Sequence, residues 1–167
     1  MNKNSWVYVA AMIDAEGCMS IGSSKHVTKA GTPYQAYSFR VQIANTSKKL
    51  MDWIVQNFGG VVYTKKQCLN PKKPVFQWFT KGGVAAQERF LLGILPYLII
   101  KREQALVGLE FIRSQREQNP EKRKMLWERI HALNLGESVE TNMSGTSFEV
   151  KIEPKLTGDC ESGPSVN

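Results

Sequence analysis

The side chains best placed for chemistry are two carboxylates, Asp14 and Glu16, which follow eight consecutive apolar residues at 6–13. A helix that is apolar all round must be covered all round, so we expect one side to face the protein's own core and the other a second subunit. Ala10 and Ala11 would let two such helices approach closely. The acids of both subunits would then emerge together at one end of the helix pair.

Other reactive groups are scarce. The three cysteines (Cys18, Cys68, Cys160) are odd in number and lack C-x-x-C spacing, so neither a disulfide framework nor a zinc site is expected. His26 and His131 lie too far apart in the sequence to suggest a histidine-based metal centre. The apolar run is too short for a membrane span, which takes roughly 20 residues, and it lacks a signal-peptide cleavage pattern. We therefore expect an intracellular protein, in a bacterial or phage-infected cytoplasm or in an organelle, that does not bind a membrane.

The net charge of +7 is concentrated in one part of the 167-residue chain. Residues 17–81 hold ten Lys or Arg and a single acid, Asp52, whereas the residues after 133 hold two lysines and six acids. A local excess of positive charge favours a polyanion partner, because contacts to phosphates release condensed counterions. The alternative is a basic surface that only faces solvent.

Periodicity predicts an ordered series of elements. A first helix, capped by Asn4 or Ser5, is followed by a strand that begins at Met19 and a strand at 37–43. A helix at about 47–58, a hairpin of strands at 61–66 and 75–81, and helices at about 83–95, 101–117 and 120–133 complete the order.

This order predicts an α+β fold of the form αββαββ-α, with a four-stranded antiparallel saddle sheet covered by helices on one face. The other face would be concave, polar and cationic, and able to enter a DNA major groove. We expect one domain at 1–135 and a C-terminal segment at 136–167 that is partly disordered. The candidate DNA-binding residues are Ser20, Lys25, Lys29, Ser38, Arg40, Gln42, Thr64, Lys66 and Gln77.

Three segments together resemble the LAGLIDADG homing endonucleases. Residues 9–17, VAAMIDAEG, keep the residue class of the nine-residue motif throughout, with alanine for its first glycine and glutamate for its second aspartate. Residues 43–60 resemble the strand-to-helix passage that follows the first hairpin of that family. Residues 95–105 resemble the stretch that carries its active-site lysine. The resemblance spans residues 6–133.

The resemblance implies a site-specific endonuclease that makes metal-dependent double-strand breaks. One copy of the motif implies a homodimer on a long, near-palindromic double-stranded DNA site, encoded within an intron in the way typical of homing. The implied interface residues are Val9, Ala10, Ala11, Ile13 and Asp14. For Asp14, a role in capping and orienting the helix ends is favoured over catalysis.

The resemblance also implies the catalytic residues. Glu16, with the backbone carbonyl of Ala15, would bind Mg²⁺, for which Mn²⁺ can substitute. Lys101 would stabilise charge or order water, and Asn45 would position solvent. Gln42 or Thr46 would take the role of Asn45 if the register shifted.

Two other functions fit the same resemblance. The protein could be an RNA maturase that binds its host intron and assists splicing, or a catalytically silent DNA-binding regulator of the same fold. The acidic residues after 133 differ from the basic segment that relatives often carry there, so their contribution to DNA binding is doubtful.

Overall fold

The computed structural model describes residues 2–65, 74–115 and 119–136. The elements run in the order α1 (Lys3–Glu16), β1 (Gly17–Val27), β2 (Pro33–Asn45), α2 (Lys48–Phe58), β3 (Val61–Lys65), β4 (Val75–Phe79), α3 (Val84–Ile94), η1 (Leu95–Tyr97), α4 (Arg102–Ser114) and α5 (Pro120–Leu135). The fold is α+β, as predicted.

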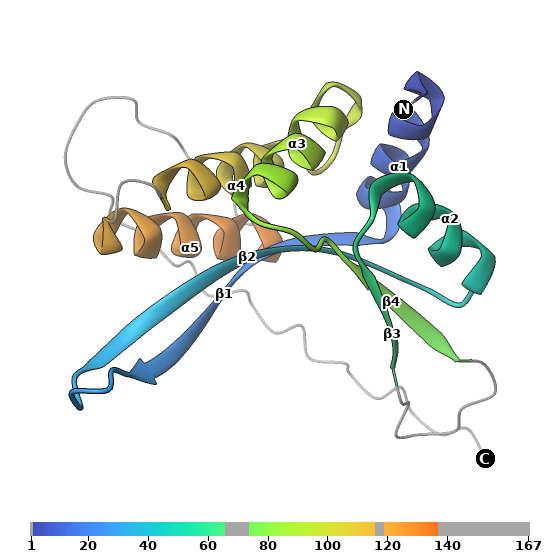
Figure 1. Cartoon of the computed structure of the whole chain (residues 1–167). Helices are drawn as coiled ribbons and strands as arrows, with labels where there is room; N and C mark the ends of the chain where they lie inside the picture. The colour runs from blue at the N-terminus through green and yellow to red at the C-terminus, as the bar shows by residue number, and fades with distance from the viewer. Residues whose placement is uncertain (1, 66–73, 116–118, 137–167) are drawn as a thin grey trace, which may run out of the picture.

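All four strands form one antiparallel sheet in the order β1-β2-β4-β3. Figure 1 shows the α-helices on one side of this sheet, which arches away from them at both ends. The long β1–β2 hairpin reaches out on one side and the short β3–β4 hairpin on the other. Among the described residues, the concave face of the arch is uncovered. The predicted saddle with helices on one face is therefore confirmed.

Several boundaries differ from the predictions. Helix α1 begins earlier than predicted, at Lys3, because Asn2 and not Asn4 or Ser5 is its N-cap and accepts a hydrogen bond from the backbone of Asn4 at 3.2 Å. Strand β4 ends at Phe79 and not at 81. Of the predicted C-terminal segment 136–167, only Gly136 lies within the described residues, where its left-handed backbone ends α5.

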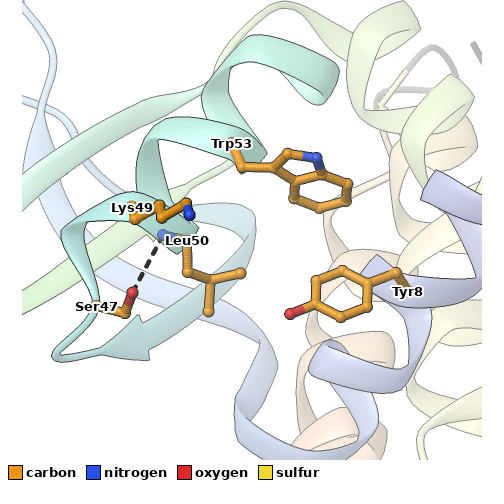
Figure 2. Close-up of a pocket in the computed structure, with 5 residues that line it drawn as sticks. All are labelled: Tyr8, Ser47, Lys49, Leu50 and Trp53. Atoms are coloured by element: carbon orange, nitrogen blue, oxygen red, sulfur yellow. Dashed lines mark hydrogen bonds between the residues drawn. The ribbon is translucent and has the colours of Figure 1, made fainter.

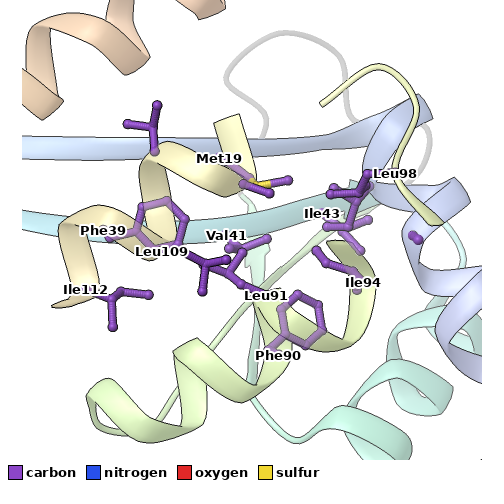
Figure 3. Packing of buried hydrophobic residues seen from close by; sticks show 14 of the residues in the cluster. Met19, Phe39, Val41, Ile43, Phe90, Leu91, Ile94, Leu98, Leu109 and Ile112 are labelled. Atoms are coloured by element: carbon purple, nitrogen blue, oxygen red, sulfur yellow. The ribbon is translucent and has the colours of Figure 1, made fainter. Parts of the chain in front are cut away.

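The core lies between the sheet and the helices (Figure 3). Met19, Phe39, Val41 and Ile43 alternate along β1 and β2 and are all at most 3% exposed. They pack against buried apolar side chains of α3, α4 and the segment between them: Phe90, Leu91, Ile94, Leu98, Leu109 and Ile112. The alternation predicted for residues 37–43, with apolar side chains facing the core, is confirmed.

Helix α4 approaches the sheet so closely that it needs a glycine at the contact. A Cβ atom on Gly108 would lie 2.4 Å from the ring of Phe39. We expect Gly108→Ala to destabilise the protein by about 1–3 kcal/mol, the usual cost of overpacking a core. Urea denaturation measures it, and Gly83→Ala is the matched control because nothing lies within 4 Å of the added atom. Equal midpoints for the two variants would contradict this packing.

Candidate functional site

The end of α1 is set by a turn that only glycine allows. Gly17 starts β1 directly after the helix, and its N–H donates to the carbonyls of Met12 and Ile13. A Cβ atom there would lie 2.7 Å from the backbone of Ile13. The chain therefore passes from helix to strand without a loop, and Glu16 lies exposed at the junction.

The interface predicted for α1 needs correction. Val9, Ala10 and Ile13 have no exposed surface in the subunit, so they pack in its own core and have no area to offer a second copy. Of the five predicted residues, Ala11 is exposed and Asp14 is half-buried. The exposed residues of the helix are instead Lys3, Asn4, Val7, Tyr8, Ala11, Ala15 and Glu16. A run that is apolar all round does not reveal which side faces inward.

Asp14 fixes the segment that carries Lys101. One carboxylate oxygen accepts the backbone N–H groups of Ile99 at 2.7 Å and Ile100 at 3.3 Å, and the other accepts that of Lys101 at 2.9 Å. The Lys101 ammonium in turn donates to the carbonyl oxygen of Asp14. Lys101 is thus tied at both its backbone and its side chain to the end of α1. Asp14 orients an active-site candidate within its own subunit.

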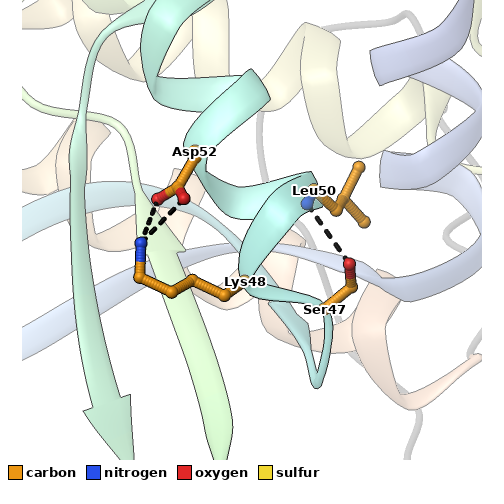
Figure 4. Close-up of polar contacts among 4 residues, drawn as sticks. All are labelled: Ser47, Lys48, Leu50 and Asp52. Atoms are coloured by element: carbon orange, nitrogen blue, oxygen red, sulfur yellow. Dashed lines mark hydrogen bonds and ion pairs between the residues drawn. The ribbon is translucent and has the colours of Figure 1, made fainter.

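Glu16 contacts Asn45 across the start of the sheet. The Asn45 amide donates to a Glu16 carboxylate oxygen at 2.5 Å, and its own oxygen accepts the N–H of Ser47 at 2.8 Å. Ser47 caps α2, and an exposed Lys48–Asp52 ion pair at 2.7 Å joins the first turn of this helix to its second (Figure 4). Asn45 is therefore held by the helix start on one side and by Glu16 on the other.

The structure brings together the three predicted catalytic residues at the end of α1. Glu16 and Asn45 are 29 residues apart in sequence and in direct contact. Lys101 is 87 residues from Asp14, to which it is bonded. The alternative Gln42 does not take the place of Asn45: its side chain accepts a hydrogen bond from Gln77 at 3.1 Å.

The uncovered face of the sheet carries most of the predicted DNA-binding residues. The β1–β2 register pairs Ser20 with Arg40 and Cys18 with Gln42, all on the side opposite the buried Met19, Phe39 and Val41. Ser38 has the same orientation because it lies two residues before Arg40, and Gln77 joins through its bond to Gln42. We call this side of the sheet the open face; the predicted residues on it are Ser20, Ser38, Arg40, Gln42 and Gln77.

The remaining predicted DNA-binding residues lie elsewhere. Thr64 pairs with Phe76 and shares the orientation of Val62 and the buried Trp78, so it is on the opposite side from the open face. Lys25 is likewise on the opposite side, at the exposed end of the hairpin, and Lys29 lies in its turn. Lys66 lies outside the described residues.

Several residues of the open face were missed, among them Tyr63 and Lys65 of β3. Tyr63 pairs with Gln77, is 61% exposed, and packs its ring edge-on against Phe79 at a centroid distance of 5.8 Å. Alternation along β3 does not identify it, because Val61 and Val62 are both apolar and only the pairing of Val62 with the buried Trp78 shows which one faces the core. On the other side of β4, Trp78 is fully buried and Phe76 packs against the core.

No family model and no curated protein sequence matches this chain. Several solved structures, however, are similar to it. The homing endonuclease I-CvuI, complexed with DNA in 2 mM Mg, aligns with a TM-score of 0.61 at 19% identity, over 78% of this chain and 82% of that one. The archaeal intron-encoded homing endonuclease I-Vdi141I, complexed with DNA, aligns at 0.58 and 16% identity over 87% and 89%. The group I intron-encoded I-CeuI, also complexed with DNA, aligns at 0.61 and 12% identity over 77% and 67%.

The chain has the homing-endonuclease fold. At these identities the likeness concerns the fold, and the assignment of residues depends on the geometry above. In this fold, the end of α1 with Glu16, Asn45 and Lys101 adjoins β1 and β2, and the open face of β2 carries Arg40 and Gln42.

The donor groups at the end of α1 fit a magnesium ion that is only partly bound by protein. Glu16 and Ala15 are both exposed, so a carboxylate and a backbone carbonyl can be reached from solvent. Asp14 is already occupied by three N–H groups. The part of the chain that the structure describes holds no cluster of three or more His, Cys, Asp or Glu suited to a metal. A single carboxylate suits Mg²⁺, which usually keeps waters and phosphate oxygens as its other ligands.

Within residues 2–65, 74–115 and 119–136, no helix has both the length and the apolar character needed to cross a membrane.

Proposed function

We propose that this protein is a site-specific endonuclease that cuts both strands of a double-stranded DNA site as a homodimer. The observation that carries the proposal is the meeting of Glu16, Asn45 and Lys101 at the end of α1, beside a polar and cationic sheet face. The homing-endonuclease fold supports it, since structural relatives were solved with DNA.

Each residue has a distinct task in phosphodiester hydrolysis. Glu16 and the Ala15 carbonyl would hold a divalent cation, Mg²⁺ or Mn²⁺, which would lower the pKa of a bound water and stabilise the leaving oxygen. Asn45 fixes the Glu16 carboxylate and presents an amide to solvent. Lys101 places a positive charge where negative charge develops on the phosphorus centre. The bond to the Asp14 carbonyl keeps this ammonium close to the helix end.

A homodimer supplies two such sites, one for each strand. Two-fold symmetry requires a target that is itself near-palindromic, with the open faces of both copies on successive segments of one duplex. Coding within an intron fits this proposal, because the uninterrupted junction would then be the target.

Incubation with a randomised plasmid library and Mg²⁺, followed by sequencing of the ends, tests the proposal. We expect paired breaks at one sequence with approximate two-fold symmetry. Failure to cut any sequence at several salt concentrations would overturn it. DNA binding without cleavage would indicate a silent regulator, and rescue of intron splicing by a Glu16→Ala protein that cannot cut would indicate a maturase.

Arg40 is the open-face residue most suited to reading a base. Its guanidinium is exposed and can donate two hydrogen bonds to guanine. We expect Arg40→Ala to relax specificity at one position in each half-site, at a cost of about 1–3 kcal/mol for the preferred base. Competition binding with single-position variants of the target measures this cost. Lys25→Ala, on the opposite face, should weaken binding equally for all variants or not at all; an identical pattern for both would contradict the assignment.

A further inference from the structure

The segment before Lys101 exposes two adjacent isoleucines that cannot withdraw from solvent. Ile99 is 87% exposed and Ile100 is 71% exposed, the highest fractions among the large apolar side chains that the structure describes. Their backbone N–H groups are both held by the Asp14 carboxylate. A rigid, protruding apolar pair of this kind is typical of a contact surface and not of a solvated loop.

A groove of matching chemistry lies between α1 and α2. It is an open cavity of about 440 Å³ lined by Tyr8, Ser47, Lys49, Leu50 and Trp53. Figure 2 shows the Tyr8 ring facing Leu50 and Trp53 across it, and the Tyr8 and Trp53 rings meet edge-on at 5.1 Å. Its walls are aromatic and aliphatic, while Ser47 and Lys49 supply its polar part.

The isoleucines and the groove lie on opposite flanks of the exposed side of α1. At 100° per residue, the exposed arc runs from Asp14 through Val7, Ala11 and Ala15 to Tyr8. Asp14, on one flank, holds the Ile99–Ile100 segment, and Tyr8, on the other, forms a groove wall. The small side chains of Ala11 and Ala15 at the centre of the arc allow another helix to come close.

The groove also lies at a suitable height along α1. Ser47 is bonded to Asn45, which contacts Glu16, so one end of the groove is level with the helix end. Tyr8 lies two turns further up. Asp14, which holds the two isoleucines, lies between Tyr8 and Glu16 along the helix axis, so the isoleucines are at the same height as the groove. A two-fold axis parallel to α1 preserves height, so it would set the isoleucines of each copy opposite the groove of the other.

We propose that Ile99 and Ile100 of each subunit insert into the Tyr8–Leu50–Trp53 groove of a second copy of this chain. The inference rests on the homodimer of the proposed function. It adds the contact that fixes the position of one copy relative to the other. Since the next residue is Lys101, the partner's groove holds the lysine segment from outside while Asp14 holds it from inside. Dimer formation thereby adds a second support to the lysine segment of each active site and does more than bring two sites together.

Sedimentation and cleavage of Ile100→Asp test this pairing. Burying a carboxylate in the apolar groove should weaken dimerisation roughly 30-fold or more, as expected for a central contact. Leu50→Asp should have a similar effect, because it places the charge on the other side of the same contact. Lys124→Asp, on the exposed part of α5, is the control and should leave the dimer intact. Unchanged dimerisation of Ile100→Asp would overturn the inference.

Cysteine cross-linking tests the contact directly, in full-length protein whose three native cysteines are replaced by serine. Under oxidation, Ile100→Cys/Leu50→Cys should give covalent dimers in high yield, whereas Ile100→Cys/Thr64→Cys should not. A disulfide within one chain, or dimers formed equally by both variants, would overturn the pairing.

Ala11→Leu separates this inference from the proposed function. Three added carbons at the centre of the exposed arc should abolish the dimer whatever happens at its flanks. One possible outcome is that Ala11→Leu abolishes the dimer and cleavage, while Ile100→Asp still dimerises and the cysteine pair gives no cross-link. That outcome would support the proposed function and contradict the pairing of the isoleucines with the groove. If native protein neither dimerises nor cuts DNA, both fall.

Discussion

Glu16→Gln is expected to abolish DNA cleavage and to leave DNA binding nearly intact. The glutamine keeps the length of the side chain, and its oxygen can still accept the Asn45 amide that donates to Glu16 in the native protein. What it loses is the negative charge that binds the cation. Because a metal ion contributes several kcal/mol to transition-state stabilisation, the rate should fall on the order of a thousandfold or more. Affinity depends mainly on phosphate and base contacts of the open face and should change little.

Single-turnover cleavage and a binding assay in Ca²⁺ measure the two quantities separately. Asp52→Asn is the matched control, since it makes the same chemical change at an exposed carboxylate of α2 that pairs with Lys48. We expect that variant to cut at the native rate. Cleavage by Glu16→Gln at a rate near that of the control would refute the ligand role of Glu16.

Asp14→Asn should have the largest effect on stability among conservative changes near the site. Both carboxylate oxygens of Asp14 accept backbone N–H groups, at 2.7 and 3.3 Å on one side and 2.9 Å on the other. Asparagine offers a single oxygen and directs its own N–H₂ group at a donor. Loss of a hydrogen bond to a charged group, with a donor left unpaired, should cost about 2–4 kcal/mol of unfolding free energy.

The same change should slow cleavage. The segment 99–101 would loosen, and with it the Lys101 ammonium that is bonded to the Asp14 carbonyl. We expect a fall of roughly 10- to 100-fold in the rate at saturating DNA, with little change in affinity, because a misplaced cation affects the transition state and not the bound duplex.

Urea denaturation and single-turnover cleavage measure the two effects of Asp14→Asn. Glu103→Gln is the control: this acid, in the first turn of α4, faces Arg129 at 3.7 Å, and its side chain is 57% exposed. An exposed pair of this kind contributes at most about 1 kcal/mol. Native stability in Asp14→Asn would show that the carboxylate does not anchor the lysine segment.

Much of the fold could be predicted from local patterns. The alternation in β2 and the helical spacing in α2 specify both the element and the side that is buried, because an amphipathic segment has one apolar face. Gly59, which ends α2 with a positive φ of 69°, marks its boundary in the sequence. These signals need no knowledge of the rest of the chain.

The α1 interface could not be predicted in the same way. Every residue at 6–13 is apolar, so no face is marked, and the choice of Val9, Ala10 and Ile13 as contact residues fell on the core side. Which side is buried depends on where β2 and α3 lie. The same holds for Thr64, whose side of the sheet depends on the register of β3 against β4.

By itself, the sequence determined the order of elements, the positive charge of the half that holds the sheet, and the candidates Glu16, Asn45 and Lys101. Only the tertiary structure decided that Glu16 touches Asn45, that Asp14 holds the lysine segment, and that Tyr63 belongs to the open face. The physical reason is the separation of the residues along the sequence. Periodicity and capping depend on residues that are close together in the chain. These contacts join residues between 14 and 87 positions apart and exist only once helices and strands have packed.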